Sequence, residues 1–369
     1  MTRSSHSKLF YTTAVLLLVG ISTALPAGVF DSISEEVNRI FEASAPSIVK
    51  VRSIAGSQPL AGSGFFIDEH GSILTSHAVV RDATKAWVEY RDQKFTAEVI
   101  GVDPRSGVAL LKIITPEKTP FLNWGDSDQL RMASGLVSVA YPYNLPLAPA
   151  FGFVTGFDVR YLNRFFATTH VRASVPVSPG QIGGPLLNTK GEVMGLLVLA
   201  IQDGKECYAL PSRSARRIVD DILTHGKAHH GWVGVGVIEG QSSEAGGRPV
   251  IVSNLFRETP AASSGLQPGD LVQSIGNKPV KAPSDILDAA FFSKVGEPLP
   301  IEVIRDGQKL TFQLPIVERP DGAAAVNSLI APGKDTLIAP YISPPEQPNP
   351  SEPTPKPSTK PVSAPNSRL

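Results

Sequence analysis

A glycine-rich loop at residues 178–185, with the sequence S-P-G-Q-I-G-G-P, is the first feature of this chain that suggests acyl chemistry. Successive backbone amides in such a loop can receive the oxyanion of a tetrahedral intermediate. Covalent hydrolysis also needs a serine hydroxyl, a histidine imidazole that takes its proton and a carboxylate that orients the imidazole. The nearest candidates for the last two groups are His77, in L-T-S-H-A at residues 74–78, and Asp103, in G-V-D-P-R at residues 101–105.

The order of these motifs resembles the HtrA/Deg family, in which a chymotrypsin-like protease domain is followed by one PDZ domain. The resemblance spans residues 34–317 and includes G-S-G-F-F-I-D at 62–68, the turn at 101–105, the loop at 178–185 and A-L-P-S at 209–212. It implies a mainly β fold: a double six-stranded β-barrel, then an α+β PDZ domain.

The resemblance places the three catalytic roles at Ile182, Ala78 and Gly107. The family has its nucleophilic serine immediately before G-G-P, but Ile182 has no hydroxyl, and the L-T-x-x-H pattern puts the general base at Ala78. His77 is one residue early, and such a shift re-aims a side chain, so it is at most a displaced base. Gly107 stands where the carboxylate precedes the strand, and Asp103 fits a turn aspartate. We therefore expect a pseudoprotease with no catalytic residues.

The glycine-rich loop keeps the shape of an oxyanion loop although its serine is lost. Its remnant consists of Gly180, Gln181, Ile182 and Gly183. Two interpretations stay open. The amides still form a small nest for an anion or carbonyl, beside a pocket that Ile182 makes apolar, or the glycines are needed only for the turn.

A second motif, G-W-V-G-V at residues 231–235, stands where PDZ domains of this family have their carboxylate-binding loop. The resemblance implies β-augmentation, in which a partner's C-terminal strand pairs with the groove edge and its carboxylate receives loop amides. The expected peptide-binding residues are Gly231, Trp232, Val233, Gly234, Val235 and Ile286. The alternative is that the valines and the isoleucine only pack the domain core.

The elements that position these motifs are mostly strands. Short apolar runs rich in β-branched residues, bounded by Gly, Pro, Asp and Ser, lie at 48–51, 64–68, 86–90, 108–113 and 193–198, as in a barrel or sandwich. Helical periodicity appears at 32–43 and at 212–223. In the second of these helices one face is formed by Ala215, Ile218, Val219, Ile222 and Leu223.

The two ends of the chain differ from its body. Residues 1–27 carry Arg3 and Lys8 before an uncharged apolar run at 9–26, which predicts either a cleaved signal peptide or a retained membrane anchor. Ten of the last thirty residues are proline, which predicts a disordered spacer. The expected organisation is an export segment at 1–27, a trypsin-like domain at 34–223, a linker at 224–230, a PDZ domain at 231–318 and a tail at 319–369.

Composition excludes several classes of function. The 34 basic and 34 acidic residues give zero formal net charge, whereas a nucleic-acid binder normally has a basic excess. Cys207 is the one cysteine of the 369 residues, so intramolecular disulfides and multi-cysteine metal sites are excluded. The histidines at 225, 229 and 230 lie in a linker without carboxylate ligands, so we expect no metal and no cofactor.

The sequence thus predicts an exported, HtrA-like pseudoprotease of the periplasm or cell envelope. It would bind peptides or protein C-termini and act as a regulator, scaffold or chaperone-like protein. An active HtrA-like relative is a further expected partner, and the family suggests a homotrimer. The alternatives are an active serine endopeptidase in periplasmic protein quality control and a structural envelope tether.

Overall fold

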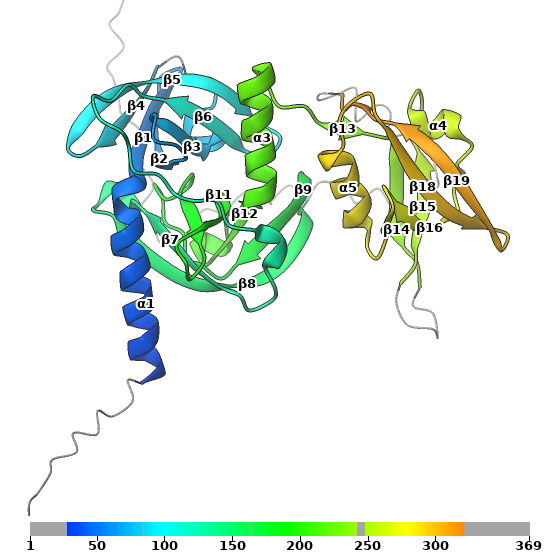
Figure 1. Cartoon of the computed structure of the whole chain (residues 1–369), viewed down its shortest axis with the longest axis horizontal. Coiled ribbons are helices and arrows are strands. Elements are labelled where there is room, and N and C mark those ends of the chain that lie inside the picture. The colour runs from blue at the N-terminus through cyan, green and yellow to red at the C-terminus, as the bar shows by residue number, and fades with distance from the viewer. Residues whose placement is uncertain (1–27, 84, 163, 242–247, 321–369) are drawn as a thin grey trace, which may run out of the picture. The chain divides into compact units, whose positions relative to one another are not determined.

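The computed structural model describes residues 28–320, except residues 84, 163 and 242–247 (Figure 1). The predicted export segment and the proline-rich part of the tail lie outside the described residues. None of the helices within the described ranges is both long and apolar enough to span a bilayer.

Six antiparallel strands form a first closed barrel, in the order β1-β2-β3-β6-β5-β4. They are β1 (Ile48–Ala55), β2 (Gln58–Phe66), β3 (Ser72–Ser76), β4 (Lys85–Tyr90), β5 (Gln93–Asp103) and β6 (Val108–Lys112). Apolar side chains from all six strands are buried inside it, among them Val51, Phe66 and Leu111. The β-branched runs of the sequence therefore form strands because their side chains fill this interior.

Six further strands form a second closed barrel, in the order β10-β11-β12-β9-β8-β7. They are β7 (Gly135–Ala140), β8 (Ala148–Tyr161), β9 (Arg164–Ala173), β10 (Pro185–Leu187), β11 (Val193–Ile201) and β12 (Glu206–Pro211). The predicted double six-stranded barrel is confirmed.

Three helices accompany the barrels: α1 (Val29–Ser44), the single turn α2 (His77–Val80) and α3 (Ser212–His225). Short 3₁₀ turns lie at Ala45–Ser47, Ser127–Gln129, Pro142–Asn144 and Gln202–Gly204. On α3 the residues Ala215, Ile218, Val219 and Ile222 are buried as predicted, but Leu223 is 59% exposed. Leu223 follows Ile222 directly, and a step of one residue turns the side chain about 100° around the helix, away from the buried face.

The PDZ domain follows as a small α+β unit, as predicted. Its main sheet has the order β14-β15-β16-β18-β19, with β17 paired to β16, and β13 pairs separately with β20. The strands are β13 (Gly231–Trp232), β14 (Val235–Glu239), β15 (Val250–Leu255), β16 (Leu271–Ile275), β17 (Lys278–Pro279), β18 (Pro298–Arg305), β19 (Gln308–Pro315) and β20 (Val317–Glu318). The helices are α4 (Pro260–Ser264) and α5 (Pro283–Phe292). Since β14 lies at an edge of the sheet, it can accept an additional strand.

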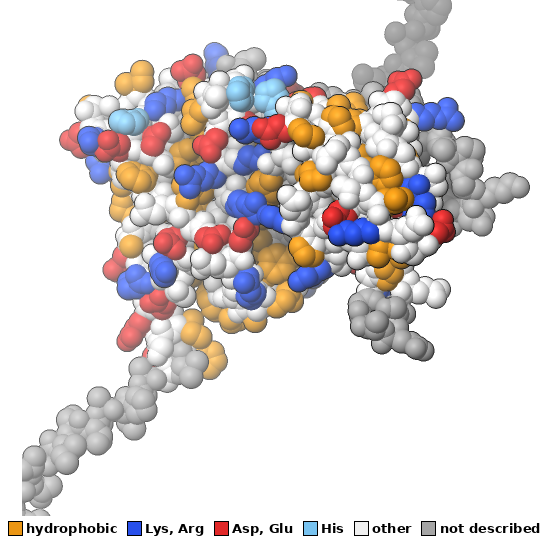
Figure 2. Space-filling model, turned by 45° about the vertical axis from the view of Figure 1, so that its right-hand side comes forward, with side chains coloured by type: hydrophobic (Ala, Val, Ile, Leu, Met, Phe, Trp, Pro, Cys, Tyr) orange, Lys and Arg blue, Asp and Glu red, His pale blue; other side chains and the backbone are white. Residues whose placement is uncertain are grey.

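Basic and acidic side chains alternate over the face shown in Figure 2, in keeping with the zero net charge of the sequence. No large single-sign patch appears on this face.

Candidate functional site: a protease-fold cavity and a PDZ loop

A cavity of about 350 Å³ lies where the general base and the carboxylate of a protease would meet. Its lining comprises Ser76, His77, Ala78, Arg81, Asp82, Pro104, Arg105, Ser106, Gly107, Phe166, His170, Val198 and Leu199. Two of the predicted triad positions, Ala78 and Gly107, thus share one cavity, together with the candidate displaced base His77. The third position, Ile182, is not part of this lining.

Ile182 has become a packing residue between the two barrels. Its partly buried side chain contacts the apolar cores of both. Its carbonyl oxygen accepts a hydrogen bond from the amide of Ser63 at 2.9 Å. A hydrocarbon side chain at this position cannot supply a nucleophile, but it excludes water from the contact between the barrels.

The amides of the glycine-rich loop are partly committed to the protein itself. The Gln181 amide donates to the Ser178 carbonyl at 3.1 Å, and the Gly183 amide donates to the Leu197 carbonyl at 2.9 Å. An oxyanion nest would therefore depend on the amides of Gly180 and Ile182.

The glycine at 183 is also explained by packing. It has φ +89°, and an added Cβ would lie 2.3 Å from the Ser63 carbonyl oxygen. Both the left-handed backbone and the close approach require glycine here, whether or not the loop binds a ligand.

Gly107, the position expected for the carboxylate, leaves little room for a larger side chain. Gly107 has φ +79°, and an added Cβ would lie 3.2 Å from Cγ1 of Val198. Its carbonyl oxygen accepts a hydrogen bond from the His77 amide at 2.9 Å. The backbone around Gly107 therefore suits glycine and the start of α2, and an aspartate here would be strained.

The hydroxyl groups that line the cavity have structural partners. Ser76 caps α2, and its Oγ accepts the Ala78 amide at 3.2 Å. The Oγ of Ser106 donates to the carboxylate of Asp103. These two bonds give each hydroxyl a role in the local backbone turn, and neither bond is of the serine–histidine type that activates a nucleophile.

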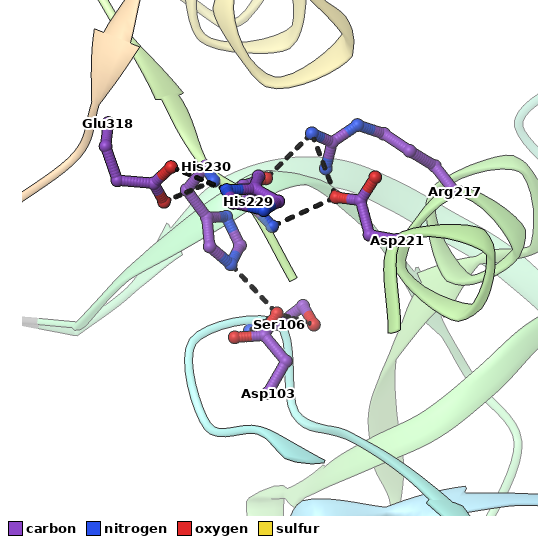
Figure 3. A network of polar contacts seen from close by, with 7 residues as sticks. All are labelled: Asp103, Ser106, Arg217, Asp221, His229, His230 and Glu318. Atoms are coloured by element: carbon purple, nitrogen blue, oxygen red, sulfur yellow. Dashed lines mark hydrogen bonds and ion pairs between the residues drawn. The ribbon is translucent and has the colours of Figure 1, made fainter. Parts of the chain in front are cut away.

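Asp103 is the turn residue that the sequence indicates, and it has a second role that sequence reasoning missed. Its carboxylate accepts the amides of Arg105 and Ser106, each at 3.2 Å, and lies 2.9 Å from Nε2 of His230 (Figure 3). Burial alone would raise the pKa of Asp103, but the bonds from His230, Ser106 and Arg105 outweigh it and hold the pKa below its usual value. No sequence signal links two residues 127 positions apart.

In the PDZ domain, the residues of the predicted peptide-binding set occupy different environments. Val233 and Ile286 are 2% and 4% exposed and belong to the domain core, whereas Val235 is partly buried at the start of edge strand β14. The packing role therefore accounts for the first two, whereas Val235 packs against the same core and keeps part of its side chain exposed.

The loop that precedes β14 has a fixed shape. Gly234 has φ +77°, and an added Cβ would lie 2.3 Å from the side chain of Thr259. The carbonyls of Val233 and Gly234 accept the amides of Ala261 and Phe256, at 3.1 and 3.0 Å. With its carbonyls engaged on one side, the loop is organised as a preformed turn beside the free edge of β14.

Trp232 and Gly231 complete this loop. The indole ring of Trp232 lies 5.3 Å from the ring of Phe256. An added Cβ on Gly231 would lie 2.3 Å from the Ala290 carbonyl oxygen of α5. Glycine at 231 thus allows the loop to approach α5 closely.

Comparison with known proteins gives two matches to family models: a trypsin-like peptidase domain at residues 62–196 and a PDZ domain at residues 231–316. A probable periplasmic serine endoprotease DegP-like of Chlamydia trachomatis is 29% identical over 315 residues, covering 81% of this chain and 63% of the relative. The protein of the same name from Pseudomonas fulva is 31% identical over 306 residues, which cover 78% of this chain and 63% of that relative. The chain therefore spans less than two thirds of the length of these relatives.

Solved structures agree on the fold. The HtrA-type protease AlgW with tripeptide superimposes with a TM-score of 0.68 at 23% identity, covering 78% of this chain and 98% of that one. Fold and sequence together define a trypsin-like domain joined to one PDZ domain. In sequence and in domain order this chain is similar to serine proteases of the HtrA/DegP type.

Proposed function

We propose that this chain is a pseudoprotease that binds peptides or protein C-termini through its PDZ domain without hydrolysing them. The observation that carries the proposal is Ile182, which stands at the nucleophile position and packs between the two barrel cores. Ala78 and Gly107 at the other two triad positions support it. Without a hydroxyl the covalent route is lost, and the remaining amides contribute to binding alone.

Peptide capture is supported by the preformed loop at residues 231–235 and by the free edge of β14. A peptide strand added there would form main-chain hydrogen bonds, and its carboxylate would receive loop amides. AlgW, which shares the fold, has been solved with a tripeptide and with a decapeptide. We extend peptide binding to this chain as part of the proposal.

The second candidate function is that of an active serine endopeptidase, which the names of the curated relatives favour. It would need His77 as the base and one of the cavity serines, Ser76 or Ser106, as the nucleophile. The bonds that both hydroxyls make to their own turns argue against it.

The cellular role follows from the same relatives, which are named periplasmic. We propose an exported protein of the periplasm or cell envelope, soluble or anchored, with a regulatory, scaffold or chaperone-like role. Its partners would be protein C-termini, further copies in a trimer, or an active HtrA-like relative. A purely structural envelope tether would lack the peptide affinity that the following experiment measures.

Fluorescence anisotropy with a library of labelled peptides tests peptide capture. We expect peptides with a free C-terminal carboxylate to bind and their amidated copies to bind at least tenfold more weakly, about 1.4 kcal/mol. Equal affinity for both forms, or no binding by any peptide, would contradict the proposal.

Two glycine variants give a matched comparison. Gly234→Ala should abolish binding because it strains the loop and crowds Thr259. Gly307→Ala has a similar φ, +76°, but no atom within 4 Å of the added Cβ, so it should bind like the natural chain. Circular dichroism of both variants separates a lost site from a lost fold, and the amidated peptides test the natural chain directly.

A further inference from the structure

The segment that enters the PDZ domain is held from both sides. The backbone N–H and C=O groups of His229 and His230 are all hydrogen-bonded (Figure 3). Their partners are Asp221 Oδ2 (3.0 Å), Arg217 Nη2 (2.7 Å), Glu318 Oε1 (3.0 Å) and the Arg319 amide (2.8 Å). Two of these residues lie on α3 and two at the end of the PDZ domain, so the linker is tied to both.

The two imidazoles extend this network. Nδ1 of His229 lies 2.9 Å from Glu318, and Nε2 of His230 lies 2.9 Å from Asp103. Asp103, at the end of β5 in the first barrel, and His230 are 5% and 7% exposed. A buried polar pair of this kind keeps its geometry because either partner left alone would lie unsolvated.

Two aromatic side chains of α5 meet two arginines of α3. The guanidinium of Arg213 lies 3.9 Å from the ring centre of Phe292, and that of Arg217 lies 4.5 Å from the ring centre of Phe291. The arginines are four residues apart and so share one face of α3. Phe291 is 2% exposed and belongs to the same apolar cluster as Ile222 of α3. A PDZ side chain thus contributes to the core formed by the barrels and α3.

A third contact joins α5 to the second barrel. The carboxylate of Asp288 accepts hydrogen bonds from the Thr168 hydroxyl at 2.5 Å, the Thr169 amide at 2.8 Å and the Thr169 hydroxyl at 2.7 Å. Both threonines lie on β9. Because the bonds come from neighbouring residues of one strand, they fix the position of α5 along that strand and its rotation.

We propose that these contacts, which we term the domain joint, lock the PDZ domain to the barrels so that the chain engages its partners as one rigid unit. Interfaces between domains of one chain are commonly polar and allow relative motion. The domain joint differs in three respects. The polar pair Asp103–His230 is buried, and the Asp288 carboxylate accepts three hydrogen bonds. The ring of Phe291 enters the core of the barrels and α3. The PDZ helix that flanks the groove therefore has one position relative to the cleft.

Electron paramagnetic resonance distances between spin labels test the lock. Cysteines replace the exposed residues Lys190 in the second barrel and Gln308 in the PDZ domain. The natural Cys207 is fully buried, and burial raises the pKa of its thiol to about 12, so it stays unlabelled. We expect one narrow distance distribution for the full chain.

Joint variants supply the comparison. Asp288→Ala combined with Arg217→Ala should broaden the distribution, whereas Arg248→Ala, which removes an exposed ion pair within the PDZ domain, should leave it narrow. If the joint variant loses its fold, the single variant Asp288→Asn replaces it. A broad distribution in the natural chain, or an unchanged narrow one in folded joint variants, would overturn the proposal.

Discussion

At the scale of single residues, the residues at the expected catalytic positions are fitted to the packing around them. Ile182 fills the contact between the barrels, and Gly107 leaves the space that Val198 borders. Neither residue carries a hydroxyl or a carboxylate at these positions. Restoring a serine alone does not restore the base, the carboxylate or the backbone around them.

Replacement of Ile182 with serine should therefore cost stability without yielding a protease. The change removes apolar contacts with two cores and places a hydroxyl there, at a cost of about 1–3 kcal/mol in the free energy of unfolding. Urea denaturation of Ile182→Ser beside Ile182→Val measures it, since the valine keeps most of the contact. A serine variant as stable as the natural chain would show that Ile182 is not a packing residue.

A carboxylate at the third position should be costly as well. Gly107→Asp combines a left-handed φ with crowding against Val198 and should destabilise the chain by about 1–3 kcal/mol. Gly191→Asp is the matched control, with φ +76° and open space around the added Cβ. The first variant should melt below the second, and Val198→Ala should recover part of the difference. Equal melting temperatures would contradict the crowding.

Asp103 should make the chain sensitive to acid. Its pKa in the folded chain lies below the ordinary value, although burial alone would raise it, because His230, Ser106 and Arg105 stabilise the carboxylate. A lowered folded pKa contributes stability that is present above about pH 4 and is lost as the pH falls through the folded value. The melting temperature of the natural chain should fall between pH 7 and pH 2, and that of Asp103→Asn should fall by less. If the natural chain and Asp103→Asn lost the same stability over this pH range, the role of Asp103 would be refuted.

At the scale of elements, the helix beside the PDZ groove depends on one carboxylate. Asp285 accepts the amides of Lys281 and Ala282, at 2.7 and 3.0 Å, where α5 begins. Asp285→Ala should cost about 1 kcal/mol and weaken peptide binding, because α5 lies against Gly231 of the proposed peptide-binding loop. Ser284→Ala in the same turn serves as the control. If chemical denaturation gave Asp285→Ala and Ser284→Ala the same free energy of unfolding, this capping role would be contradicted.

The elements themselves were largely predictable. Alternating and β-branched apolar runs predicted strands in both barrels, and apolar residues at helical spacing predicted α1 and α3. Both predictions work because apolar side chains that recur with the period of a strand or a helix lie on one face, which is buried. The face of α3 was predicted one residue too wide at Leu223. The motifs placed the three expected triad positions, and two of them, Ala78 and Gly107, line one cavity. They did not predict the lining from β9, such as Phe166 and His170, because strand pairing across the barrel brings it there.

At the scale of the whole molecule, two features combine: barrels with a cavity at two of the expected catalytic positions, and a PDZ domain that we propose is held on them by the domain joint. The domain joint could not be predicted from the sequence, because each of its contacts joins residues that are distant along the chain, such as Thr168 and Asp288. Local patterns carry no information on such pairs. A chain that is inactive and rigid, as we propose, and that has β14 at an edge of its PDZ sheet is suited to hold a partner rather than to process it.

Hydrolysis by the purified chain from residue 28 onward tests the central claim most directly. Casein and an unfolded protein serve as substrates, a fluorophosphonate reports any activated serine, and an active DegP-like protease is the positive control. We predict no cleavage above the blank and no fluorophosphonate labelling. Cleavage that the fluorophosphonate abolishes would contradict the account and would place a working hydroxyl elsewhere in the chain.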